Sequence, residues 1–261
     1  MSFSTKASTN KPLSSSLRSP LELVVQSLQI YRTHFWALIG YSAWLILPFT
    51  GYFFLSFFPE QNPFVHIGMT FFSVVEFVIT FWIGIIFTLF AHWVIEKHPF
   101  TPEELSHASM QLLHPSARVF FLYILLVLAG FLLLVLPGFI ALVVLAFAQT
   151  AVILDGKYGM SAIRFSISLV KGRFLSMVYR LVGGPILIGF LYSVVTALLL
   201  ILSGGLSGST PSELIQVSVL PAWMIYLQSV VQIFAIPLLA TYMTILYKEV
   251  TISPTNSVET P

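Results

Sequence analysis

Glu76 is the only acidic residue that lies well inside a long hydrophobic stretch of this sequence. A charged carboxylate deep in a membrane is costly, so it must be protonated, paired or exposed to a wet cavity. Two interpretations follow: Glu76 couples transport to a proton or cation, or it is a neutral acid hydrogen-bonded to a neighbouring segment. The second is favoured, because other hydrophobic stretches contain polar residues that could pair with it, namely Gln149, Gln228 and Gln232.

The other reactive side chains form no pattern that is typical of catalysis. The sequence contains no cysteine, which excludes disulfides, thiolate metal sites and thiol nucleophiles. Its six histidines are scattered, without a His-Glu-x-x-His pair, and Gly-x-Ser-x-Gly turns and close carboxylate pairs are also missing. We therefore predict no catalytic residue, no metal site and no cofactor, and we expect that the protein is not an enzyme.

The composition is that of an integral membrane protein. Hydrophobic residues make up 57% of the 261 residues and charged residues only 8%, against about 25% in ordinary soluble domains. The net charge of +2 is too small to indicate nucleic-acid binding. Because a span needs roughly 20 apolar residues, we predict an all-α integral membrane protein, a bundle of about six transmembrane helices with amphipathic interfacial helices.

The predicted spans lie within one membrane domain. Residues 19–250 form this single six-span domain, and the polar segments 1–18 and 251–261 are predicted to be disordered cytoplasmic tails. The spans are expected at about residues 35–58, 67–95, 117–136, 139–154, 177–202 and 226–247.

All twelve basic residues fall on one side of the membrane when these stretches are interpreted as spans. The three connections on the other side, around residues 59–66, 137–138 and 203–214, contain no Lys or Arg. Positive charge is retained on the cytoplasmic side during insertion. The charge pattern therefore predicts a multi-pass protein with both termini in the cytoplasm.

Pro137 and Gly138 separate the third and fourth predicted spans. Proline followed by glycine suits a type II turn, because proline presets its backbone angle and glycine accepts a positive φ. The alternative is one long kinked helix across Ala117–Leu154, which would place basic residues on both sides of the membrane. The charge bias favours a helical hairpin that turns at Pro137–Gly138.

Three capping boxes indicate helix starts, at Ser19-Pro20-Leu21-Glu22, Thr101-Pro102-Glu103-Glu104 and Thr210-Pro211-Ser212-Glu213. Each combines a hydroxyl N-cap, proline at the first helical position and glutamate at the third. After the first two boxes, apolar and polar residues separate onto opposite faces. The expected apolar face after the first box comprises Leu21, Val24, Val25, Leu28, Tyr31 and Phe35, and the one after the second comprises Leu105, Ala108 and Leu112. We therefore expect amphipathic helices that lie along the interface before a span.

A further surface helix is predicted over Met160–Phe174. Its apolar stripe comprises Ile163, Ile167, Val170 and Phe174, opposite a polar face with Arg164, Ser168 and Lys171. Such a helix would lie in the headgroup layer, where each cation gains about 1 kcal/mol from anionic lipid. We predict that this segment contacts lipid or a partner protein through Lys157, Arg164, Lys171 and Arg173.

The latter half of the chain resembles a known family. The matching features are Pro137-Gly138 before an apolar helix, Leu154-Asp155-Gly156, Lys171-Gly172, the final Leu246-Tyr247-Lys248-Glu249, and the single positions Ala162, Ser166 and Leu169. These resemble the six-span bacterial membrane proteins of the YciC type, and a similar membrane domain is attached to some glycerophosphodiester phosphodiesterases. The family more often has Glu where this chain has Asp155. The resemblance implies a bacterial plasma (inner) membrane protein and carries over no enzymatic role, since nothing here corresponds to the phosphodiesterase's catalytic barrel.

The favoured hypothesis is a non-catalytic membrane protein that organises lipids or partner proteins through cytoplasmic amphipathic helices. Its expected partners are membrane lipids and other membrane proteins. The alternative is a small secondary transporter or permease that uses Glu76, supported by the glutamines and by the prolines inside the predicted spans. A lipid-modifying intramembrane enzyme has the least support, because no nucleophile and base occur at a useful spacing.

Overall fold

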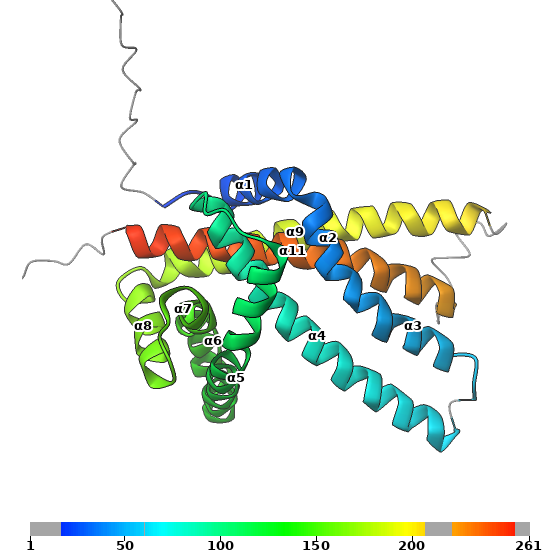
Figure 1. Ribbon diagram of the computed structural model, residues 1–261. Helices are drawn as coiled ribbons and strands as arrows, with labels where there is room; N and C mark the ends of the chain where they lie inside the picture. Colours follow the sequence, from blue (N-terminus) through cyan, green and yellow to red (C-terminus); the bar gives the residue numbers. More distant parts are fainter. Residues whose placement is uncertain (1–16, 60, 207–220, 254–261) are drawn as a thin grey trace, which may run out of the picture.

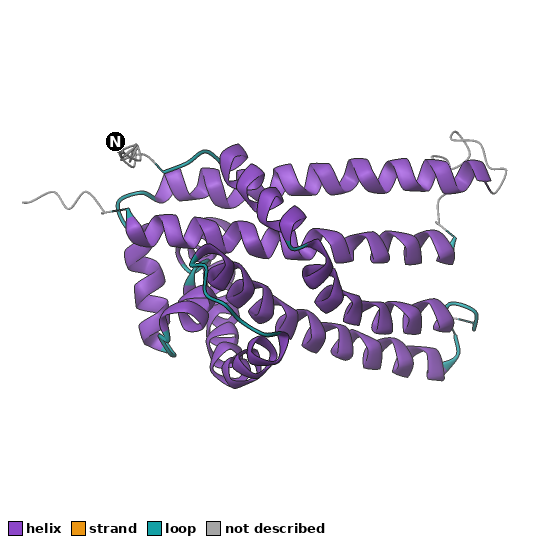
Figure 2. Cartoon of the chain, turned by 45° about the horizontal axis from the view of Figure 1, so that its top comes forward, coloured by secondary structure: helices purple, strands orange, loops and turns teal. Residues whose placement is uncertain are grey.

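The computed structural model describes residues 17–59, 61–206 and 221–253, and every regular element in these ranges is a helix (Figure 2). In chain order (Figure 1) the elements are α1 (Pro20–Thr33), α2 (Phe35–Ser42), the 3₁₀ turn η1 (Ala43–Leu45), α3 (Ile46–Leu55), α4 (Pro63–Ile95), α5 (Pro102–Leu133), α6 (Val135–Val144), α7 (Ala148–Asp155), α8 (Met160–Val170), α9 (Phe174–Leu206) and α11 (Ala222–Ile252).

The described residues contain six helical segments that are long and apolar enough to cross a membrane, which confirms the predicted all-α bundle. Their bounds are Phe35–Leu55, Pro63–Ile95, Pro102–Leu133, Val135–Asp155, Phe174–Gly204 and Ala222–Ile252. The helices α3, α4 and α9 pack against α11, and α3 also packs against α4. Both described ends of the chain and α8 lie at one end of the molecule, and the connection between α3 and α4 lies at the other (Figure 1).

Two capping boxes form as predicted. The hydroxyl of Ser19 accepts a hydrogen bond from the backbone N–H of Glu22 at 3.3 Å, and the Glu22 carboxylate accepts one from the Ser19 N–H at 2.9 Å. The same reciprocal pair links Thr101 and Glu104, at 3.2 and 2.9 Å. Both boxes satisfy backbone donors that a helix start leaves unpaired. The third predicted box, at Thr210, lies outside the described residues.

The helices that follow these boxes pack on the protein itself. The buried stripe of α1 contains Leu23, Val24 and Ser27, whereas Leu21, which we expected on the same face as Val24, is 61% exposed. This stripe rests on α9 and α11. Burial against two neighbouring helices, and not the pattern of the helix alone, therefore selects which residues of α1 face inwards.

The predicted surface helix after Thr101 and the third predicted span form one helix, α5, that passes through Pro115. A proline inside a helix removes one backbone hydrogen bond, at a cost of about 3 kcal/mol. Packing against α4 offsets that cost, because Leu105 is fully buried there and the indole of Trp82 donates a 2.9 Å hydrogen bond to the hydroxyl of Ser109. The amphipathic segment expected in this region is therefore the first half of α5 and not a helix of its own.

The predicted hairpin forms between α5 and α6, but its turn was placed wrongly. Leu134 reverses the chain in an extended conformation, while Pro137 and Gly138 lie in the first turn of α6. Proline is well placed there because the first turn needs no N–H from it. Gly138 serves close packing instead of a positive φ: a Cβ on Gly130 would lie 3.0 Å from the Gly138 Cα.

The fourth apolar segment is broken between α6 and α7, at residues 145–147. The hydroxyl of Ser166, on α8, crosses the break: it donates a 2.7 Å hydrogen bond to the carbonyl of Val144 and accepts one from the N–H of Phe147. Two clusters of buried apolar residues form the core. The first core cluster surrounds this point and joins α7, α8 and α11, and the second joins α2, α3 and the C-terminal half of α4.

Candidate functional site

Six basic residues gather at the end of the molecule where both described chain ends lie, and we call this end the basic end. They are connected there by hydrogen bonds, ion pairs or a shared groove: Arg18, Lys157, Arg164, Arg173, Arg180 and Lys248. The residues divide into two parts. One is a set of arginines that hold the chain ends, and the other is an open groove beside α8.

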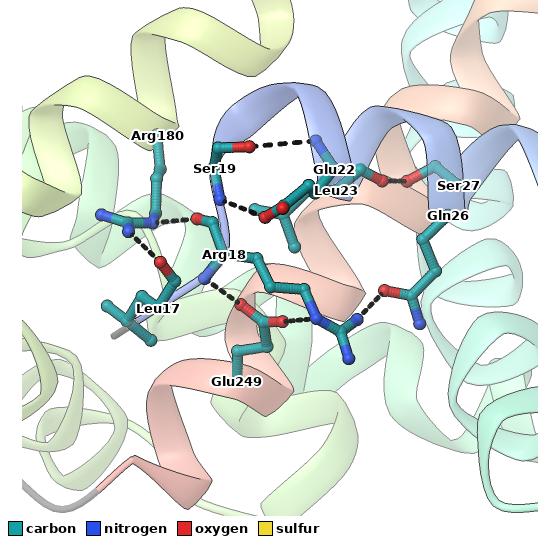
Figure 3. A network of polar contacts seen from close by, with 9 residues as sticks. All are labelled: Leu17, Arg18, Ser19, Glu22, Leu23, Gln26, Ser27, Arg180 and Glu249. Atoms are coloured by element: carbon teal, nitrogen blue, oxygen red, sulfur yellow. Dashed lines mark hydrogen bonds and ion pairs between the residues drawn. The ribbon is translucent and has the colours of Figure 1, made fainter. Parts of the chain in front are cut away.

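Arg180 is the most buried cation of the basic end, with only 8% of its surface exposed. Its guanidinium donates hydrogen bonds to the carbonyl oxygens of Leu17 at 2.6 Å and Arg18 at 2.7 Å (Figure 3). It also donates to the Ser176 carbonyl at 2.9 Å and to the Ser176 hydroxyl. A buried charge is tolerated when its hydrogen bonds are satisfied. Among the described residues no carboxylate lies within ion-pair distance of Arg180, so the dipoles of these carbonyls stabilise its charge.

Arg18 fastens the same segment to the last helix. Its guanidinium forms a 3.0 Å ion pair with Glu249 of α11 and also contacts the side-chain oxygen of Gln26 (Figure 3). The Arg18 N–H donates to the second carboxylate oxygen of Glu249 at 3.4 Å. Together with Arg180, these contacts hold the segment before α1 against α9 and α11.

Arg173, which we predicted as a lipid or partner contact, is used internally. Its guanidinium donates to the carbonyl oxygens of Leu169 and Val250, both at 2.7 Å, near the C-terminal ends of α8 and α11. Carbonyls at a helix C-terminus lack helical partners and carry negative partial charge, so they suit a cation. Burial and the nearby Arg180 lower the pKa of Arg173. We therefore leave Arg173 out of the candidate contact surface.

An open groove of about 640 Å³ lies between α8 and the loop that precedes it. The ammonium of Lys157 lies 4.4 Å from the centre of the Phe165 ring, a cation–π contact, and Arg164 is exposed. Within the described residues neither cation has a carboxylate within ion-pair distance. The groove is lined by Asp155, Gly156, Lys157, Tyr158, Ser161, Arg164, Phe165 and Ser168.

The loop between α7 and α8 is shaped by two glycines with positive φ and by one serine. Gly156 ends α7 at φ +60°, and Gly159 precedes α8 at φ +56°. The Ser161 hydroxyl accepts from the N–H of Tyr158 at 3.1 Å and donates to the Tyr158 carbonyl at 2.6 Å. Glycine is favoured at positive φ because it has no Cβ. This backbone holds Lys157 over the α8 side chains.

The apolar face of α8 packs on the protein. Ile163 and Val170 of the predicted stripe are buried in the first core cluster, but Ile167 is 41% exposed beside Arg164 and Ser168. The buried face is centred on Ser166, because this residue must reach the break between α6 and α7. The prediction that Ile167 belongs to the buried apolar stripe was therefore wrong. Arg164 and Lys171 are exposed, as predicted.

Asp155 joins the groove to the centre of the bundle. The hydroxyl of Tyr247, on α11, donates a 2.6 Å hydrogen bond to the Asp155 Oδ2. One residue further along α11, Lys248 forms an ion pair with Glu96 at the end of α4. The pKa of Glu96 is lowered, chiefly by the hydrogen bond from Lys248. These contacts place the groove near the C-terminal ends of α4 and α11, where charged residues occur.

The predicted intramembrane site at Glu76 has a different partner from those expected. The hydroxyl of Tyr52, on α3, donates a 2.9 Å hydrogen bond to the Glu76 Oε2. Gln149 and Gln228 are half-buried and Gln232 is exposed, and none of the three is hydrogen-bonded to Glu76. The sequence showed that Tyr52 lies in the neighbouring span but contained no signal for the register between the two helices.

No cluster of histidine and acidic side chains that could hold a metal ion occurs in the part of the chain that the structure describes. The family model that is described as a domain of unknown function (DUF7847) matches residues 54–250.

The chain belongs to the DUF7847 family. The matched region begins within α3 and covers the groove, α8 and the Tyr247 contact. Searches of curated proteins and of solved structures find no match. The family is uncharacterised, and its match neither supports nor contradicts the resemblance to the YciC type. That resemblance stays a prediction.

Proposed function

We propose that this DUF7847 protein is a non-catalytic membrane protein that organises lipids or partner proteins through the surface of α8. The observation that carries the proposal is the state of three cations on and around α8: Lys157 and Arg164, which line the groove, and Lys171, the residue that follows α8. None of them has a carboxylate within ion-pair distance in the described part of the chain, whereas Arg18 and Lys248 are paired and Arg173 and Arg180 hold carbonyls.

Unpaired cations at this level of the bundle suit a negatively charged surface. Each contributes about 1 kcal/mol of attraction to anionic lipid, so the three together correspond to roughly a hundredfold in affinity. We also propose that the basic end faces the cytoplasm of a bacterium, at its inner membrane. The retention of positive charge on the cytoplasmic side supports this orientation.

A double charge reversal tests the proposal, Arg164→Glu with Lys171→Glu. Purified protein in neutral detergent would be titrated with a fluorescent phosphatidylglycerol, and co-purifying proteins would be identified in the same preparations. We expect the double variant to weaken lipid binding at least about thirtyfold. The matched control is Arg32→Glu with Lys97→Glu, two exposed cations that do not line the groove and that also form no ion pair among the described residues. If the surface of α8 is the contact, this control should lose clearly less lipid binding than the double variant.

Unchanged lipid binding together with an unchanged set of co-purifying proteins would rule the proposal out. Loss of a particular protein with lipid binding intact would identify the partner as a protein. Equal losses in the control variant would show that net charge, and not the surface of α8, is responsible.

The alternative function, a small transporter, rests on the polar contacts between spanning segments. Glu76 pairs with Tyr52, and the hydroxyls of Thr50 and Tyr226 approach to 3.2 Å between α3 and α11. Substrate-dependent flux in liposomes that is lost in Glu76→Gln would favour this function. Flux absent over a broad panel of solutes would exclude it and leave the pair with Tyr52 as a packing contact.

A further inference from the structure

We propose that the groove beside α8 is a binding site for the phosphoethanolamine headgroup of a membrane lipid. The site deepens the proposed function, on which it rests, by naming one ligand chemistry. It combines two cations, Lys157 and Arg164, with one carboxylate, Asp155, on the wall of a single groove. A zwitterionic headgroup carries the complementary pair of charges, a phosphodiester and a primary ammonium.

The phosphate would lie between Lys157 and Arg164. An arginine fork binds two phosphate oxygens at once, and a lysine supplies a compact point charge. Lys157 is held in place by its contact with the Phe165 ring, which does not neutralise its charge. The Ser161 hydroxyl is engaged by the Tyr158 backbone and the Ser168 hydroxyl by the Phe165 carbonyl. The two cations are therefore the principal donors for a phosphate.

The ammonium would pair with Asp155. Tyr247 donates to Oδ2 of this residue and leaves Oδ1 without a hydrogen-bond partner among the described residues. A carboxylate beside a phosphate site repels a purely anionic ligand and attracts a neighbouring cation. Choline has no N–H to donate and a glycerol headgroup has no positive charge. The carboxylate therefore favours ethanolamine over both.

The position of the groove fits a lipid and not a soluble metabolite. Asp155 in the groove is hydrogen-bonded to Tyr247, and the next residue of α11, Lys248, pairs with Glu96 at the end of α4. The groove therefore lies near helix ends that carry charged groups. Large side chains are exposed here: Tyr158, in the wall of the groove, is 56% exposed, and Met160, two residues further along the chain, is 48% exposed. Tyrosine and apolar residues at such a level are typical of the membrane interface. A headgroup in the groove would leave its acyl chains beside these residues.

The test uses the full chain in neutral detergent with a phosphatidylethanolamine that carries a fluorophore on its acyl chain. Unlabelled phosphatidylethanolamine, phosphatidylcholine and phosphatidylglycerol with identical acyl chains would compete for the site, as would glycerophosphoethanolamine, which has no acyl chains. We expect phosphatidylethanolamine to compete about tenfold better than phosphatidylcholine or phosphatidylglycerol. Glycerophosphoethanolamine should compete at least as weakly as phosphatidylcholine.

Two single variants separate the two ends of the headgroup. Asp155→Asn keeps an acceptor for Tyr247 and should abolish the preference for ethanolamine over choline while both lipids still bind. Arg164→Gln should weaken both lipids by about tenfold and keep the preference. Thermal unfolding of both variants would be recorded, and Lys157→Gln would replace Arg164→Gln if that variant did not fold.

The absence of a preference for ethanolamine, or a preference that survives Asp155→Asn, would overturn the headgroup site. Competition by glycerophosphoethanolamine as strong as by the lipid would replace the lipid with a soluble ligand and would also overturn it. The proposed function has its own readout in the charge-reversal variant. If phosphatidylglycerol binding still depends on Arg164 and Lys171 but no preference for ethanolamine is found, the headgroup site is refuted and the proposed function stands.

Discussion

Ser166 of α8 accepts a 3.1 Å hydrogen bond from the backbone N–H of Phe147, within the break between α6 and α7. In an unbroken helix this N–H would bond to Val143, but the N–H of Ala146 occupies that carbonyl. The freed carbonyl of Val144 accepts from the same serine hydroxyl. One fully buried side chain therefore satisfies two of the backbone groups that the break releases.

Replacing Ser166 with alanine should destabilise the bundle by about 1–3 kcal/mol, because a buried N–H and a buried carbonyl lose their partner. Reversible unfolding in mixed micelles would measure the loss. Ser168→Ala is the control, since Ser168 is exposed and bonds only to the carbonyl of Phe165 in its own helix. Equal stability of the two variants would contradict this role of Ser166.

Gly184 and Gly189, five residues apart on α9, should respond in opposite ways to alanine. A Cβ on Gly184 would lie 2.0 Å from the Cζ of the fully buried Tyr242, whereas one on Gly189 meets nothing within 4 Å. Overpacking typically costs 1–3 kcal/mol, and alanine favours an open helical position by about 1 kcal/mol. Thermal unfolding should show Gly184→Ala destabilised and Gly189→Ala neutral or stabilised. A stable Gly184→Ala protein would argue against the close packing of α9 on α11.

The pair between Glu96 and Lys248 should make stability depend on pH at the acid end. The hydrogen bond from Lys248 lowers the pKa of Glu96, and His92 adds to this effect. Because the pKa of Glu96 is lower in the folded protein than in the unfolded chain, its charge stabilises the fold fully at pH values above the unfolded pKa of about 4.3. This stabilisation is lost as the pH falls through the folded pKa. Because Glu96 is half-exposed, the contribution is below about 1 kcal/mol.

Comparing Glu96→Gln with the wild type over the acid range tests this. The wild type should be slightly more stable above about pH 5, and the two unfolding curves should converge at lower pH. A difference that persists below the folded pKa would mean that the carboxylate charge is not responsible. Glu103→Gln serves as the control, because Glu103 is exposed and forms no ion pair within the described residues.

Features that depend on neighbouring residues were predictable from the sequence. The capping boxes at Ser19 and Thr101 require only four residues each, and the apolar lengths indicate six spans whatever their packing. The exposure of Arg164 and Lys171 followed from the helical period. These properties depend on local sequence or on composition, so they do not need the relative positions of the helices.

Features that depend on contacts between distant helices were not predictable. Arg180 was expected only as a topological charge, yet its partners Leu17 and Arg18 lie more than 160 residues earlier in the chain. The pairing of Glu76 with Tyr52 depends on the register between two helices, which hydrophobicity does not specify. The inward face of α8 was predicted only in part: Ile163 and Val170 are buried as expected, but Ser166, a polar residue, is buried in place of Ile167.

The orientation of the protein can be tested because the chain contains no cysteine. Single cysteines at three exposed positions, Gln61→Cys, His107→Cys and Ser168→Cys, would be labelled in intact cells with a membrane-impermeant maleimide. The charge bias predicts labelling of the first alone, and of all three after the membrane is opened. Labelling at position 107 or 168 in intact cells would refute the cytoplasmic placement of the basic end.

Arg180 should be needed to hold the segment before α1 on the bundle. Arg180→Lys keeps the charge but loses the fork that reaches the carbonyls of Leu17 and Arg18, so these hydrogen bonds weaken by about 1–3 kcal/mol. Amide hydrogen exchange in α1 should then accelerate, while exchange in α7 stays as in the wild type. Arg164→Lys is the matched control, since Arg164 is exposed and does not contact α1. If α1 exchanges equally slowly in both variants, the ion pair between Arg18 and Glu249 holds the segment without help from Arg180.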